Sequence, residues 1–167
     1  MEPWIKEAAE RLRRRREGER DRLGRRPDAA KTLHFQAPLL WRTLAHKIEI
    51  AINAFNNEFT ADPLCPNPLM YSRLDHSITI STVYCTEHSP TQKLIVTFYG
   101  DRALVISGLS SSDGSAPPAA GPPHELQFRV SNDGRVEIYN GDHAISPDEA
   151  VRQILEPLID CMDLIAF

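Results

Sequence analysis

The segment HELQFRVSNDGRVEIY, residues 124–139, decides the fold class because it contains two strand patterns and the turn that joins them. Polar and apolar residues alternate on both sides of the turn, which is typical of strands with one buried face. The turn Asn132-Asp133-Gly134 favours a hairpin, because glycine accepts the positive φ angle that tight turns require. The segment therefore predicts antiparallel strands whose inward-facing residues are Leu126, Phe128, Val130, Val136 and Ile138.

Three segments upstream show the same period of two, at residues 76–85, 93–100 and 103–108. Residues 109–123, LSSSDGSAPPAAGPP, predict a flexible insertion between the third and fourth strands, because their composition cannot build a packed core. The chain thus predicts a five-stranded antiparallel meander within residues 76–139. The inward-facing residues expected in the upstream strands are Ile78, Ile80, Thr82, Tyr84, Leu94, Val96 and Phe98.

The strongest helical pattern covers residues 38–59, where Pro38 suits a first helical turn. Its apolar residues recur at spacings of three and four, but Ile50 falls on the far side, where another apolar helix face could cover it. Residues 60–75 contain three prolines, so we expect a surface crossing from helix to sheet there. The apolar stripe of the helix consists of Leu40, Trp41, Leu44, Ala45, Ile48, Ala51, Ile52, Phe55 and Phe59.

A second amphipathic helix is predicted over residues 146–165. Ser146 is its expected N-cap and Glu149 completes a capping box, while Pro157 is expected to kink the helix or end its first half. With two amphipathic helices and one alternating sheet, the economical packing places both helices on one face of the sheet. The predicted fold class is therefore α+β: a five-stranded antiparallel meander with two amphipathic helices on one face, preceded by a charged N-terminal helical arm.

The charge balance divides the chain into an arm with its linker, residues 1–31, and a body, residues 32–167. The arm holds 11 Lys and Arg against 7 Asp and Glu, a net charge of +4, whereas the body holds 8 against 16, a net charge of −8. Residues 3–23 are predicted to form a helix, followed by a linker over residues 24–36. The acidic body argues against a nucleic-acid-binding surface on the body itself, because phosphates need cationic partners.

The arm helix has an apolar face only in its first three turns. Glu7–Arg11, Glu10–Arg14 and Asp21–Arg25 have the four-residue spacing of helix-surface ion pairs, which predicts that the arm partly neutralises its own arginines. The candidate interaction residues on the apolar face are Trp4, Ile5, Ala8 and Leu12. The candidate phosphate-binding residues are Arg11, Arg13, Arg14, Arg15 and Arg16.

The composition is that of a folded domain, with 41% hydrophobic and 25% charged residues. No apolar run approaches the ~20 residues that cross a bilayer, and the first residues lack a signal-peptide pattern. Three widely spaced cysteines predict reduced thiols rather than a disulfide framework or a zinc ribbon. We therefore expect a cytoplasmic protein with no membrane partner.

No phosphate-binding loop or catalytic signature is present in the sequence, so no catalytic residue and no cofactor are predicted. One pattern could provide a metal or acid–base site: a histidine is adjacent to an acidic residue at 75–76, 87–88, 124–125 and 142–143. In a meander, His124 and His143 fall at the same sheet edge, on or beside neighbouring strands. Solvated turn residues are the simpler interpretation, but a metal or acid–base site there would use His124, Glu125, Asp142 and His143.

Three functions follow from these features, in descending order. The first is a non-enzymatic protein–protein interaction, adaptor or assembly module, which would contact a protein partner or a second copy through the arm helix, the sheet and the C-terminal helix. The second is nucleic-acid binding through the arginine-rich arm. The third is a small-ligand-binding or metal-dependent enzyme with a site at the His124/His143 sheet edge.

Overall fold

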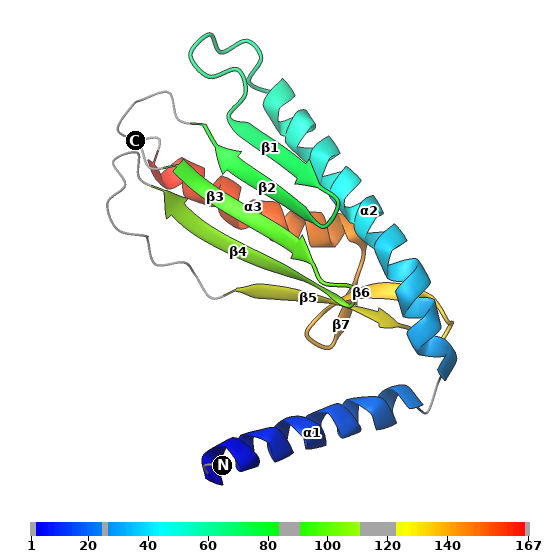
Figure 1. Cartoon of the computed structure of the whole chain (residues 1–167). Coiled ribbons are helices and arrows are strands. Elements are labelled where there is room, and N and C mark those ends of the chain that lie inside the picture. Colours follow the sequence, from blue (N-terminus) through cyan, green and yellow to red (C-terminus); the bar gives the residue numbers. More distant parts are fainter. Residues whose placement is uncertain (1–2, 25–26, 84–90, 111–122, 166–167) are drawn as a thin grey trace.

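The computed structural model describes residues 3–24, 27–83, 91–110 and 123–165 (Figure 1). The helices are α1 (Pro3–Gly24), α2 (Pro27–Asn57) and α3 (Pro147–Ile165). The strands are β1 (Leu69–Leu74), β2 (Ser77–Thr82), β3 (Thr91–Phe98), β4 (Arg102–Ser110), β5 (His124–Val130), β6 (Val136–Asn140) and β7 (His143–Ile145). The predictions for Tyr84, Glu87, His88 and most of the 109–123 insertion lie outside the described residues.

The strands form one open, antiparallel sheet in the order β1-β2-β3-β4-β5-β6-β7. The predicted α+β class and the meander are confirmed, but the strand number is wrong, because the sheet has seven strands rather than five. The two additional strands are its edges. Sequence alternation missed β1 because only Leu69 is buried in it, and it missed β7 because that strand has three residues.

The β5–β6 hairpin forms at the predicted turn. Gly134 has a φ angle of 77°, and its N–H donates a 3.0 Å hydrogen bond to the carbonyl of Ser131. Beyond the turn, Phe128 lies opposite Ile138, and both side chains are buried. This hairpin therefore fixes which residues of β5 and β6 face the core.

The core lies between one face of the sheet and the helices α2 and α3, which contact each other (Figure 1). Trp41 of α2 stacks on Phe98 of β3 with ring centroids 5.5 Å apart, and Phe98 meets Phe128 edge to face. Most residues predicted to face inward are buried: Ile78, Ile80, Thr82, Leu94, Val96, Phe98, Leu126, Phe128 and Ile138. Val130 and Val136 are half-buried, and Leu69, Ala103 and Val105 are buried strand residues that the sequence pattern did not assign. Below, we call the opposite side of the sheet the open face.

Helix α2 begins eleven residues earlier than its predicted start at Pro38, so most of the expected linker is helical. Pro27 supplies the helix start instead, and Pro38 lies inside the helix, where it removes one backbone hydrogen bond. Packing compensates, because Ala37 is fully buried, Leu33 and Leu40 pack against the core, and Gln36 Oε1 accepts the Val136 N–H at 3.3 Å. Helix α2 ends at Asn57, so Phe59 follows the helix rather than lying in it.

Helix α3 begins as the sequence predicts. The Ser146 hydroxyl accepts the Glu149 N–H at 3.1 Å, which satisfies one of the otherwise unpaired donors of the first turn. The helix runs through Pro157 and buries Val151, Ile154, Leu155 and Leu158. Within the described ranges, no helix is both long and apolar enough to cross a membrane.

Candidate interaction surfaces

Helix α1 extends away from the sheet and its two packed helices (Figure 1). The side chains described in it, from Pro3 to Gly18, are all exposed. Trp4, Ile5 and Leu12 are 62%, 42% and 51% exposed, and with Ala8 they fall within about 100° around the helix axis. These four residues, here called the arm stripe, form an apolar face on an otherwise charged helix.

The arm arginines do not form one face. At 100° per residue, Arg11 and Arg13–Arg16 point to all sides of the helix. Among the described residues, neither Glu7 and Arg11 nor Glu10 and Arg14 form an ion pair, so this predicted self-neutralisation is not formed. The predicted pair of Asp21 and Arg25 lies outside the described residues. Because only part of the arginine set can meet one phosphate backbone at a time, the arrangement favours solvation over nucleic-acid recognition.

A second apolar face lies on the outside of α2. Phe35, Leu39 and Ile50 are 71%, 58% and 54% exposed, and their spacing places them within about 60° around the helix. These three residues, here called the outer stripe, lie almost opposite the buried stripe of the same helix. Exposure of Ile50 is confirmed. The sequence pattern does not reveal Phe35 and Leu39 as part of this face, because it predicts a linker over residues 24–36 and a helix that begins only at Pro38.

The open face of the sheet has an apolar half over β1–β4. The strand register pairs Ile95 directly with Ile106, and their neighbours across β1 and β2 are Ser72 and Thr79. The charged residues on this half, among the described positions, are Lys93 and Arg102. The exposed large apolar residues here, called the open-face patch, are Met70, Leu74, Ile95 and Ile106.

The β5–β6 half of the open face is polar and internally paired. Gln127 donates to Glu125 at 3.1 Å and accepts from Arg129, whose guanidinium also lies 5.0 Å from the Tyr139 ring centroid. The Tyr139 hydroxyl in turn donates to Glu137 at 3.4 Å. These contacts leave the open-face patch as the apolar part of this face.

The edge of β1 is largely covered by side chains of α2. Because the Pro68 carbonyl bonds the Val83 N–H, alternation turns the backbone groups of Leu69, Tyr71 and Arg73 outward. The Asn56 side chain pairs with both outward groups of Leu69, at 2.8 and 3.0 Å. At the other end, Trp41 Nε1 donates to the Asp75 carbonyl at 3.0 Å. Between these bonds, only Tyr71 and Arg73 still turn backbone groups outward for pairing with an added strand. The edge of β1 is therefore a poor site for strand addition.

The sequence pattern does not predict a structural role for Asn56, because a polar residue on an amphipathic helix normally faces water. It is 9% exposed and lies at the margin of the buried stripe, about 40° around the helix from Ile52 and about 60° from Trp41. The role of this asparagine can be predicted only once β1 is known, because its partners are backbone groups of that edge strand. Its amide matches the donor and acceptor of one peptide group, which explains its place here.

The predicted histidine–carboxylate site is not assembled. His124 Nε2 lies 3.3 Å from Asn140 Oδ1, and Asn140 donates to Gln153 of α3 at 2.9 Å. Glu125 points to the opposite face of the sheet, because successive strand residues alternate. His143 and Asp142 are exposed. Across the ranges that the structure describes, no group of three or more His, Cys, Asp or Glu side chains is placed to hold a metal ion.

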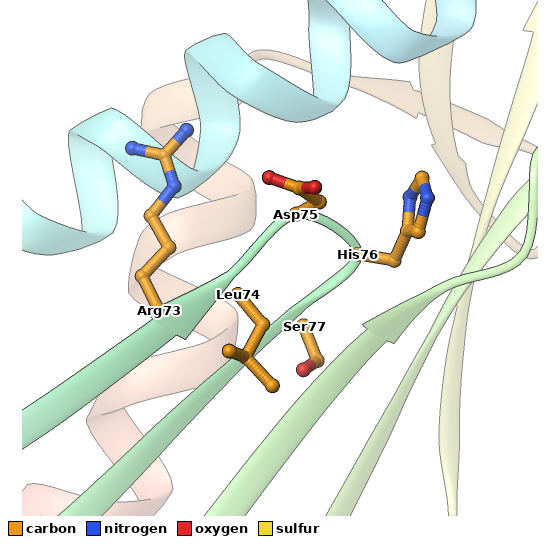
Figure 2. Close-up of a pocket in the computed structure, with 5 residues that line it drawn as sticks. All are labelled: Arg73, Leu74, Asp75, His76 and Ser77. Carbon is orange, nitrogen blue, oxygen red and sulfur yellow. The ribbon is translucent and has the colours of Figure 1, made fainter.

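A pocket lies at the β1–β2 turn and is lined by Arg73, Leu74, Asp75, His76 and Ser77 (Figure 2). Figure 2 shows Arg73 pointing toward the α2 ribbon, while Leu74 and Ser77 point away from it. Arg73 lies 3.4 Å from Glu49, so its charge is already paired. The pocket therefore offers no convergent set of free polar groups, and we assign it no ligand.

Comparisons with known proteins give no functional information. No family model matches this chain, and neither the curated proteins nor the solved structures gave a significant match.

Proposed function

We propose that this chain is a non-enzymatic protein–protein interaction or assembly module whose first contact surface is the arm stripe. The observation that carries the proposal is the exposure of Trp4, Ile5 and Leu12 along one face of a projecting helix. Apolar surface is stabilised by about 25 cal/mol per Å² when it leaves water, so such a face favours association. An amphipathic helix presented in this way is a common form of peptide recognition.

Two further surfaces support an assembly role. The outer stripe of α2 and the open-face patch are both apolar and exposed. The covered edge of β1 favours contact through these faces over strand addition. Three widely spaced cysteines support placing this activity in a reducing compartment, which we take to be the cytoplasm.

The experiment compares two positions on opposite sides of α1. A photo-crosslinking amino acid is placed at Leu12, on the arm stripe, or at Glu10, about 160° around the same helix. Each full-length variant is irradiated in the cells that naturally make the protein, and adducts are separated by mass. We expect discrete protein adducts from position 12 and several-fold fewer from position 10.

Other outcomes reject the proposal. Equal labelling from both positions, or no protein adduct from position 12, would show that the arm stripe has no specific protein partner. Adducts that contain nucleic acid would favour the arginine-rich arm as the functional element instead.

A further inference from the structure

We infer that two copies of this chain exchange arms, so that the arm stripe of one copy packs antiparallel along the outer stripe of α2 in the other. This inference rests on the proposed function and names its partner as a second copy. It starts from two apolar faces on consecutive helices, both exposed: Trp4, Ile5 and Leu12 on α1, and the outer stripe on α2.

The connection between the helices favours their pairing. Helix α1 ends at Gly24 and α2 begins at Pro27, so two residues join them. Helices joined by so short a segment are normally antiparallel neighbours. Here α1 instead extends away from the body and leaves the arm stripe exposed (Figure 1). The neighbour that such a connection predicts is therefore missing from the single chain.

The spacings of the two stripes agree with an antiparallel pair. If the pairing continues the register set by Gly24 and Pro27, facing residues have numbers that add up to 51. Leu12 then faces Leu39, and Ala8 faces Thr43, which is exposed on α2. The small Ala8 side chain lets the helix axes approach closely between two larger contacts. In the same register Ile5 faces His46 and Trp4 faces Lys47, about one turn before Ile50.

A second copy is favoured over the chain's own α2 because the arm extends away from its own body (Figure 1), and exchange between two copies makes the helix–helix contact without folding the arm back. The arm carries a net charge of +4 and the rest of the chain −8, so electrostatic attraction at long range favours association of an arm with a body. Twofold exchange forms each contact twice.

The test uses full-length chains in which Cys65, Cys85 and Cys161 are replaced by serine. One chain carries Leu12→Cys and the other Leu39→Cys, and the two are mixed and oxidised. We expect a covalent dimer that joins the two different chains. The matched control mixes the Leu12→Cys chain with a Leu64→Cys chain, since Leu64 is 81% exposed but lies far from the outer stripe in the sequence and on no helix. Circular dichroism checks that every variant is folded.

Two results would overturn the inference. One is a cross-linking yield in the mixture no higher than in the Leu64 control. The other is efficient cross-linking only within a single chain that carries both Leu12→Cys and Leu39→Cys, which would mean that each arm folds back on its own α2. If either occurs while position 12 still gives adducts with other proteins, the second-copy inference is wrong and the proposed interaction function stands.

Discussion

The two sides of α2 carry similar apolar side chains, but those on one side are buried and those on the other are exposed. Trp41, Leu44 and Ile48 on the inner side are almost completely buried against the sheet, whereas Phe35, Leu39 and Ile50 on the outer side are more than half exposed. Both sets follow helical spacing, so neither is a random scatter of apolar residues. The difference is that the sheet covers one set and, within the described residues, no element covers the other.

This difference separates residues that stabilise the fold from residues that are available for association. Burying the inner side stabilises the single chain, because its apolar area leaves water on folding. The outer side contributes to stability only when a second surface covers it. Substitutions on the inner side should therefore change unfolding at every protein concentration, and those on the outer side should act through assembly.

The largest effect is expected at Trp41. Trp41→Ala removes a buried ring that stacks on Phe98 and donates to the Asp75 carbonyl, so it should lower the free energy of unfolding by about 3–5 kcal/mol. Phe35→Ala is the matched control on the outer stripe. At concentrations where the chain is a monomer, it should change stability by no more than about 0.5 kcal/mol. Urea unfolding followed by circular dichroism measures both values. An equal decrease in the free energy of unfolding for the two variants would contradict the distinction between the two sides.

A smaller effect is expected at Asn56. Asn56→Ala leaves the N–H and carbonyl of Leu69 without their partner, which should cost about 1–3 kcal/mol in the same unfolding measurement. It also lengthens the free edge of β1, so the variant should aggregate faster on heating than the wild type. Asn53→Ala, at an exposed position one turn earlier, is the control and should leave both properties unchanged. Unchanged stability of Asn56→Ala would refute the edge-covering role.

The smallest effect is expected at the margin between the two sides. Lys47 bonds Asp148 of α3 at 2.8 Å, but both side chains reach solvent. Lys47→Met should therefore lower stability by no more than about 1 kcal/mol, and less at high salt. Lys31→Met, on the exposed start of the same helix, is the comparison. A loss as large as that of Trp41→Ala would mean that the α2–α3 contact depends on this ion pair rather than on apolar packing.

Sequence alternation predicted the strands whose inner residues are buried by the helices. It worked for Ile78, Ile80, Leu94 and Val96 because one face of each strand meets the core and the other does not. It failed for β1, since an edge strand with an exposed outer face has no reason to alternate. The start of α2 was hidden by Pro38, whose cost is offset by tertiary packing that a local pattern does not contain.

The candidate sites also differ in whether local sequence spacing is enough to predict them. The arm stripe was predicted from spacing alone, because α1 is a simple amphipathic helix and needs no tertiary information. The histidine–carboxylate site depended on which residues share a face, and adjacency in the sequence places Glu125 on the opposite face from His124. The outer stripe required the full length of α2, so it was found only in part, through Ile50.

Sedimentation velocity over a wide concentration range tests the central claim most directly. The wild-type chain should pass from a monomer of 18.8 kDa to a dimer as its concentration rises. Leu39→Asp places a charge in the outer stripe and should stay monomeric and folded, whereas Leu64→Asp should dimerise like the wild type. A wild-type chain that remains a monomer at every concentration, or a Leu39→Asp variant that dimerises equally well, would contradict the account.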